Sequence, residues 1–247
     1  MDLTTLLAPS RILDFNSPNI QSLIKQRRWK EMPQEQAAKE IYNFCRNEIP
    51  FGYNAQADDM KASAVLSEGL GHCNTKSTLL MALFRAIEIP CRLHGFTIDK
   101  KLQKGAITGL VYWLAPNEIV HTWVEAFYQD NWISLEGLIL DEAYLKSVQK
   151  KYPDCHHPFL GYAVATQDLQ NPNVEWTGKS TFIQSEGIKQ RFGIFATPDE
   201  FYAKHPTNLK GIKGWLYRHY FYKKMNAHIA QIRNDGVPGL QSCCDPK

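Results

Sequence analysis

The sequence from Ala64 to Gly95 reads AVLSEGLGHCNTKSTLLMALFRAIEIPCRLHG. A glycine-containing turn leads into Cys73, and the residues that follow, as far as Ile87, place apolar side chains at the spacing of one helical face. This spacing predicts a buried helix that begins at Cys73. Because the first N–H groups of a helix lack internal partners and carry partial positive charge, a thiol there ionises more readily than free cysteine, whose pKa is about 8.5. Cys73 is therefore a candidate nucleophile.

A second segment, from His121 to Gly137, reads HTWVEAFYQDNWISLEG and predicts a β-hairpin that turns at Gln129-Asp130. Side chains alternate along a strand, so His121 and Trp123 lie on the same face. A turn at this place sets Glu136 opposite Trp123, and Glu136 is then a diagonal neighbour of His121 at a Cβ separation of about 7–8 Å or less. This register predicts a contact between His121 and Glu136, whereas a slip of one residue would turn Glu136 to the other face.

Two other acids are alternatives to Glu136 as the partner of His121. Glu125 lies on the same strand face but farther along, and Asp141 follows the hairpin. A histidine held by an acid suits a nucleophilic thiol as its base, because the pKa of imidazole lies near neutrality. The spacing favours Glu136.

The two segments resemble the core of the transglutaminase-like superfamily. In the first segment the resemblance is carried by Ala64, Leu66 to Leu70, Gly71, Cys73, Ile89, Pro90, Arg92 and Gly95. The second segment resembles the histidine strand of that family and the hairpin after it. The resemblance implies that Cys73 is the nucleophile, His121 the base and Glu136 the orienting acid. The family most often has an aspartate followed by proline at the last position, so Glu136-Gly137 departs from its pattern.

The resemblance also implies an α+β papain-like fold. In this fold, the helix that carries the nucleophile packs on an antiparallel sheet, and here extra helices are expected at both ends of the chain. We expect residues 1–247 to form a single domain, with the transglutaminase-like core at about 33–140 and a C-terminal elaboration at about 141–236.

The activity implied by the resemblance is thiol-dependent acyl chemistry on an amide, through a Cys-His-Glu triad and a thioester. We favour hydrolysis, as in a protease or amidase, with a peptide, a protein or a small-molecule amide as substrate. The alternatives are transfer of the acyl group to an amine, as in a transglutaminase or acyltransferase, and a non-catalytic protein-binding module. The presence of all three polar residues argues against the binding module.

Acyl transfer also needs hydrogen-bond donors for the tetrahedral oxyanion, and each donor is worth about a hundredfold or more in rate. The backbone N–H of Cys73 is one candidate. The side chains of Tyr53, Asn54 and His72 are candidates for a second donor, and the sequence does not choose among them.

The net charge and the composition limit the classes of partner that the chain is expected to have. The chain has 247 residues, with 28 Lys plus Arg against 25 Asp plus Glu, and a net charge of +3. A balance this small gives no reason to expect nucleic acid as a partner. We expect neither a secretory signal nor membrane insertion, because the sequence has no sustained apolar run. The six cysteines are scattered and have no paired spacing of the metal-binding type, so reduced thiols in the cytoplasm are the simpler interpretation.

No cofactor or metal is expected. Cys155-His156-His157 has the residue types of a metal site, but adjacent side chains on an extended chain point apart, and no second cluster completes a set of four ligands. For the rest of the chain, the apolar spacing and the helix-start signals predict helices at about 17–28, 33–49, 58–66, 141–150 and 210–233. Strands are predicted at 91–98, 109–114, 120–128, 132–135 and 161–165, and little structure at 167–187.

Overall fold

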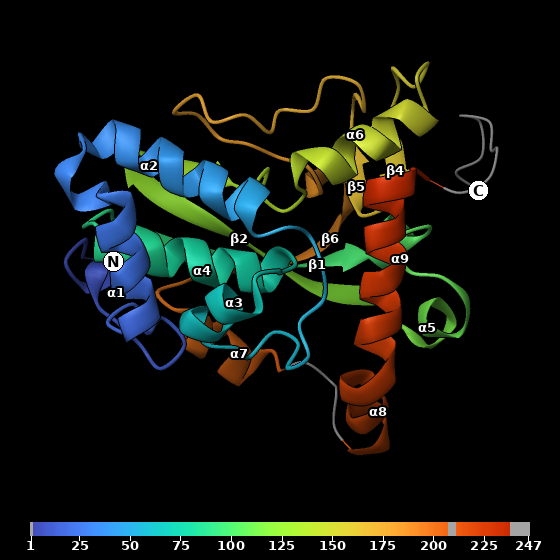
Figure 1. Cartoon of the computed structure of the whole chain (residues 1–247), viewed down its shortest axis with the longest axis horizontal. Helices are drawn as coiled ribbons and strands as arrows, with labels where there is room; N and C mark the ends of the chain where they lie inside the picture. The colour runs from blue at the N-terminus through green and yellow to red at the C-terminus, as the bar shows by residue number, and fades with distance from the viewer. Residues whose placement is uncertain (1, 207–210, 238–247) are drawn as a thin grey trace.

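The computed structural model describes residues 2–206 and 211–237, and a four-stranded antiparallel sheet lies at its centre (Figure 1). The strand order is β3-β2-β1-β6. The strands are β1 (Cys91–Asp99), β2 (Glu118–Tyr128), β3 (Asn131–Leu135) and β6 (Ile188–Phe195). The β2–β3 register pairs Val124 with Leu135 and Tyr128 with Asn131, as the sequence predicted.

The central helix α4 (Cys73–Ala86) is buried along its whole length. It packs against β2 and β1 of the sheet and is flanked by α2 (Gln34–Asn43) and α3 (Ala62–Glu68) (Figure 1). Burial on every side explains why its apolar residues are not confined to one stripe. The fold is the predicted one, a helix that begins at Cys73 and packs on an antiparallel sheet.

The other N-terminal elements are close to the prediction. Helix α1 (Pro18–Arg27) follows Ser17, and α2 continues as a π-helical turn, Phe44–Glu48. Helix α3 begins later than the predicted boundary at residue 58, because its N-cap is Lys61 and neither Asp58 nor Asp59. The carboxylate of Asp58 instead accepts a hydrogen bond from Nδ2 of Asn74 on α4, at 2.8 Å.

The predicted strand at 109–114 is also wrong. This segment is the helix α5 (Gly109–Leu114), which has no buried residue and leaves the Trp113 side chain 74% exposed. Both edges of β1 are already paired, with β2 and β6, so the apolar run cannot join the sheet beside it. Its backbone bonds are satisfied locally, because the N–H of Ala115 donates to the carbonyls of Val111 and Tyr112.

Strand β6 was not predicted from the sequence. It lies at the edge of the sheet, and its middle residues, Lys189 to Arg191, are exposed and polar, so the segment lacks the apolar alternation of a half-buried strand. The strand predicted at 161–165 is a small hairpin of β4 (Phe159–Gly161) and β5 (Val164–Thr166). Tyr162 and Ala163 make the tight turn, both with positive φ.

The C-terminal part of the chain adds helices beside the sheet. Helix α6 (Glu142–Lys151) is capped by Asp141, and α7 (Pro198–Lys204) packs against β1 and β6. The helix predicted at 210–233 is three segments: α8 (Gly211–Leu216), a π-helical turn at Tyr217–Phe221, and α9 (Tyr222–Asp235). Lys210 lies outside the described residues. Helix α9 runs beside α6.

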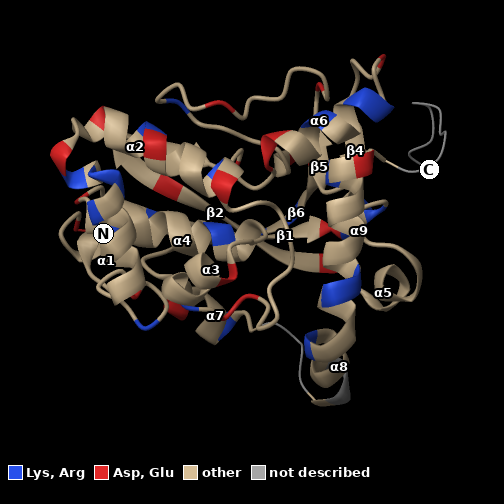
Figure 2. Ribbon diagram, viewed as in Figure 1, with Lys and Arg blue, Asp and Glu red and all other residues tan. Residues whose placement is uncertain are grey.

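Short 3-10 turns complete the fold at Thr5–Leu7, Trp29–Glu31, Lys100–Gln103 and Ser185–Gly187. Acidic and basic side chains are interspersed over the elements (Figure 2). In the part of the chain that the structure describes, no helix has the length and apolar character needed to cross a membrane. The four cysteines in that part, Cys45, Cys73, Cys91 and Cys155, are free thiols, and Cys243 and Cys244 lie outside it.

Candidate functional site

Cys73 is the first residue of α4, and its position is fixed by the turn before it. The N–H of His72 donates to Oγ1 of Thr75 at 3.0 Å, which caps the helix start. The backbone of Gly71 bonds to that of Pro50 and Gly52. A Cβ atom on Gly71 would lie 2.8 Å from Cγ of Lys76, so only glycine fits this close approach. The Cys73 residue is 8% exposed.

His121 and Glu136 meet behind Cys73. Nε2 of His121 lies 2.7 Å from Oε1 of Glu136, and both side chains are fully buried. Glu136 is the first residue after β3, so the predicted hairpin register brings it to the histidine. The other two acids are engaged elsewhere: Glu125 pairs with Arg92 and His94, and Asp141 pairs with Arg233. Of the three predicted candidates, the structure joins only Glu136 to His121.

The second oxygen of Glu136 is held by a segment that the sequence analysis left without structure. Oε2 accepts hydrogen bonds from the backbone N–H groups of Ile183 at 2.9 Å and Gln184 at 3.0 Å. These bonds fix the carboxylate with Oε1 toward His121. No pattern in residues 167–187 signals this role, because backbone donors leave no mark in the side-chain sequence.

The ring of His121 is oriented by these contacts. With Nε2 on Glu136, its Nδ1 is buried and makes no hydrogen bond to any nitrogen or oxygen of the described residues. Nδ1 is therefore the ring nitrogen that remains for the Cys73 thiol. An imidazole that pairs with an acid through one nitrogen and keeps the other for a thiol is the arrangement that a histidine base requires.

The electrostatics of this group favour a thiolate–imidazolium pair. Burial raises the pKa of Cys73, but the charge of His121, its hydrogen bond and the adjacent His72 outweigh burial and lower the pKa from 9.0 to about 7. Burial lowers the pKa of His121, yet Cys73 and Glu136 together raise it to about 10. By contrast, burial raises the pKa of Cys45 to about 12 and also raises that of Cys91. Among these three buried thiols, Cys73 alone has a lowered pKa.

Two of the three candidates for the second oxyanion donor are engaged in other bonds. The hydroxyl of Tyr53 donates to Oε1 of Gln103 at 2.8 Å. The amide of Asn54 donates to Glu68 at 2.8 Å and to the carbonyl of Leu70 at 3.0 Å. The third candidate, His72, places Nδ1 3.9 Å from Sγ of Cys73.

Asn74 is a site residue that the sequence analysis missed. It is buried directly after the nucleophile, and its Oδ1 lies 3.5 Å from Sγ of Cys73. The same oxygen accepts a hydrogen bond from Thr122 Oγ1 at 3.1 Å, and Nδ2 donates to the carbonyl of Val120 at 3.1 Å. Asn74 thus ties α4 to the strand that carries His121. The sequence gives no distinct signal for this role, because Asn74 is the first of five consecutive polar residues, Asn74 to Thr78.

Helix α9 forms hydrogen bonds with the loop that precedes α4. Asn226 on α9 accepts a hydrogen bond from the N–H of Tyr53 at 2.7 Å and donates to its carbonyl at 2.9 Å. Arg233 on the same helix contacts both oxygens of Asp141 and the carbonyl of Phe51. Residues far beyond Gly137 therefore hold the loop before α4.

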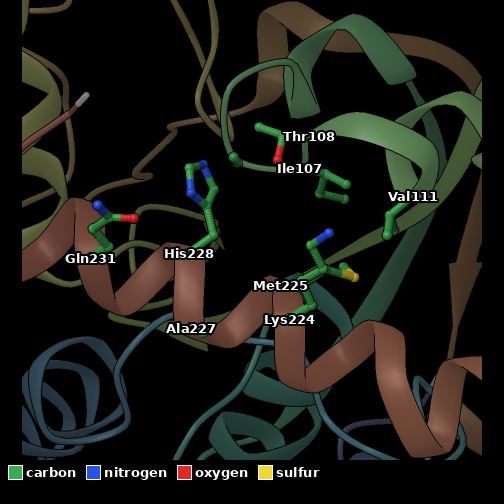
Figure 3. A pocket seen from close by; sticks show the side chains of 9 residues that line it. Ile107, Thr108, Val111, Lys224, Met225, Ala227, His228 and Gln231 are labelled. Carbon is green, nitrogen blue, oxygen red and sulfur yellow. The ribbon is translucent and has the colours of Figure 1, made fainter. Parts of the chain in front are cut away.

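A cavity of about 260 Å³ lies between α9 and the segment around α5. Figure 3 shows Lys224, Met225 and His228 on α9 opposite Ile107 and Val111. Cys73, His121 and Glu136 do not line it. Residues 2–206 and 211–237 contain no cluster of three or more His, Cys, Asp or Glu side chains suited to a metal ion, and Cys155 contacts only His157 of its two histidine neighbours.

Comparison with known protein families identifies a family for the core of the chain. The sequence profile of the transglutaminase-like superfamily matches residues 21–137. The chain has a transglutaminase-like core. This core contains Cys73, His121 and Glu136, and it ends one residue after the acid. Its architecture is mixed α and β, with the helix that begins at Cys73 packed on the antiparallel sheet. The backbone groups of Ile183 and Gln184 that hold Glu136 lie outside the matched residues.

Other comparisons are more distant. No curated protein matches the sequence. One similar solved structure is named "a Putative Cysteine Protease from Cytophaga hutchinsonii", with 15% identity and a TM-score of 0.46. The match covers 81% of this chain and 50% of that chain, so this chain spans about half the length of that structure.

Proposed function

We propose that this protein is a thiol-dependent amide hydrolase that acts through Cys73, His121 and Glu136. The observation that carries the proposal is the buried His121–Glu136 pair at 2.7 Å, with the other ring nitrogen of His121 left for the thiol at the start of α4. A purely structural histidine at this depth would be expected to satisfy both nitrogens with protein hydrogen bonds.

The proposed reaction begins with the thiolate of Cys73 and the protonated imidazole of His121. Sγ attacks the carbonyl carbon of the amide, and the electron pair of the C=O bond moves to oxygen. The backbone N–H of Cys73 at the helix N-terminus stabilises this oxyanion. His121 gives its Nδ1 proton to the leaving amine as the C–N bond breaks, and a thioester remains on Cys73.

In the second half, His121 removes a proton from water, whose oxygen attacks the thioester carbon. The C–S bond breaks, the acid leaves, and the thiolate–imidazolium pair is restored. Glu136 keeps the proton of Nε2 in place throughout, so that Nδ1 exchanges the proton with thiol, amine and water. An amine in place of water gives acyl transfer by the same steps. The substrate class is a peptide, a protein or a small-molecule amide, and the free thiols suit the reducing cytoplasm.

The first test measures the pH dependence of iodoacetamide alkylation at Cys73, followed by mass spectrometry beside Cys45 and Cys91. We expect Cys73 to react selectively, with a midpoint near pH 7, and His121→Ala to abolish that selectivity. A panel of fluorogenic amides and peptides, with Cys73→Ala as control, then identifies turnover. Added hydroxylamine traps the thioester as the hydroxamate in either case. A dilute primary amine then separates the two activities, because a transferase forms the new amide whereas a hydrolase releases the acid. A Cys73 that reacts no faster than Cys45 and Cys91 would overturn the proposal and favour a binding module.

A further inference from the structure

We propose that Cys73 is served by a second histidine–carboxylate pair, His72–Asp58, which stabilises the thiolate in addition to the His121–Glu136 pair. This inference rests on the proposed function, because it assigns a further catalytic residue to the same thiol. The three residues lie close together: Nδ1 of His72 is 3.9 Å from Sγ of Cys73, and Nε2 is 3.6 Å from Oδ1 of Asp58.

The His72 ring is built into the site rather than lying on the surface. The His72 residue is 7% exposed and Asp58 5%. The ring stacks on Tyr53 at a centroid distance of 5.9 Å, and Asp58 is itself fixed by the amide of Asn74. The imidazole therefore has a defined orientation, with one nitrogen toward the sulfur and the other toward the acid.

The backbone before Asp58 supports the same assignment. Ala57 has a φ of 57°, a left-handed conformation that costs a residue with a side chain about 1 kcal/mol or more. In this conformation the carbonyl of Ala57 is close enough to the His72 ring to help raise its pKa. The loop thus holds two acceptors, a carbonyl and a carboxylate, against one histidine. A residue that served only to cap α4 would need neither of them.

The formal charges around the sulfur indicate what the His72–Asp58 pair does. When Cys73 is ionised, the thiolate, Glu136 and Asp58 are three formal negative charges, and the His121 imidazolium is one positive charge. Protonation of His72 supplies the second positive charge beside the sulfur. Burial lowers the pKa of His72, but Cys73 and Asp58 outweigh burial and raise it. The proton on His72 comes from solvent, while the thiol proton goes to His121, so the two histidines do not compete for one proton.

Other titratable groups near His72 do not offer this charge. Tyr53 stacks on the ring, and Tyr202 on α7 and Tyr217 on the π-helical turn lie near Asp58. Burial raises the pKa of all three phenols, so they are neutral at neutral pH. Oδ1 of Asn74 accepts the proton of a neutral thiol and gives a thiolate no support.

The test compares the pH profile of Cys73 alkylation in His72→Asn and Asp58→Asn. Asparagine is a strong N-cap residue, so His72→Asn keeps the start of α4 while removing the charge. We expect the midpoint to rise by about one pH unit in His72→Asn, because an opposite charge within about 4–6 Å shifts a pKa by 1–3 units. We expect a rise of the same size in Asp58→Asn, because His72 loses the acid that raises its pKa and becomes neutral. At pH 7 this is a roughly fivefold slower alkylation.

The chain offers matched controls. His94 pairs with Glu125 at 2.8 Å, so His94→Gln removes a histidine–carboxylate pair in which Cys73 takes no part. Asp59 is next to Asp58, but its side chain is 53% exposed and pairs with Arg11. Asp59→Asn therefore removes a carboxylate from the same loop while it leaves His72 and Asp58 unchanged. We expect the profile of Cys73 in both controls to match the wild type. Conversely, Cys73→Ser should lower the pKa of His72 measured by NMR of ring-labelled histidine.

The outcomes separate the two proposals. If His121→Ala raises the midpoint while His72→Asn and Asp58→Asn leave it unchanged, the second pair is structural and this inference is overturned. If Cys73 is unreactive in the wild type, or if His121→Ala has no effect, the proposed function itself fails.

Discussion

The substitution Glu136→Gln tests the site most sharply, because it keeps the shape of the side chain and removes its charge. Two backbone N–H groups, of Ile183 and Gln184, require an acceptor at the Oε2 position. The amide oxygen of glutamine must face them, since burying two unpaired donors would cost about 1–3 kcal/mol each. The NH₂ group then faces Nε2 of His121. That nitrogen must accept, so the neutral ring carries its proton on Nδ1, where it cannot take the thiol proton.

The magnitude follows from the pKa of Cys73. At a pKa of about 7, half of the thiol is ionised at pH 7. If the pKa of Cys73 returns to its ordinary value of 9.0, roughly 1% is ionised, which makes alkylation at pH 7 about 50-fold slower. This shift corresponds to about 2.7 kcal/mol. Turnover should fall further, by about 10³- to 10⁴-fold, because neutralising the buried acid in a serine-protease triad has an effect of that size.

The assay is the iodoacetamide pH profile read by mass spectrometry, with circular dichroism to verify folding. Glu125→Gln is the matched control, since Glu125 holds His94 rather than His121. We expect the profile of Cys73 in the control to be unchanged. A folded Glu136→Gln variant whose Cys73 alkylates within twofold of the wild-type rate at pH 7 would refute the role of the acid.

Two further predictions concern stability. Arg233→Ala leaves the carboxylate of Asp141, which is 5% exposed, without its partner, so the free energy of unfolding measured in urea should fall by about 2–4 kcal/mol. Arg27→Ala is the control, because it breaks an exposed pair with Glu48 and should lower this free energy by less than about 1 kcal/mol. Equal losses in the two variants would contradict the argument that the buried pair matters more. Burial lowers the pKa of Lys76 from 10.5 to about 7, so between these values the unfolded chain holds more protons and stability rises with pH. Relative to Lys76→Met, the wild-type free energy of unfolding should rise by about 1.4 kcal/mol per pH unit between pH 7.5 and 9.5. If the free energies of unfolding of the two proteins change with pH in parallel, Lys76 is charged in the folded protein and the argument is wrong.

The local pattern of the sequence was enough to predict the elements at the centre of the fold. Apolar spacing after Cys73 predicted α4, and strand alternation with a turn at Gln129-Asp130 predicted the β2–β3 register that brings Glu136 to His121. Both are determined by short-range periodicity and turn geometry, which a sequence shows directly. The helix at Gly109–Leu114 was mistaken for a strand because its type depends on whether a sheet edge is free, and neither edge of β1 is.

What completes the site was decided by the tertiary structure alone. The donors to Glu136 are backbone groups of Ile183 and Gln184, which any side chain could accompany. Asp58 had the chemistry of a helix cap in the sequence, and only the folded chain shows its carboxylate against His72 and Asn74. A nucleophile and its helix follow from spacing along one segment. The charges and donors that surround it come from segments far apart in the sequence, and folding alone brings them within hydrogen-bond distance.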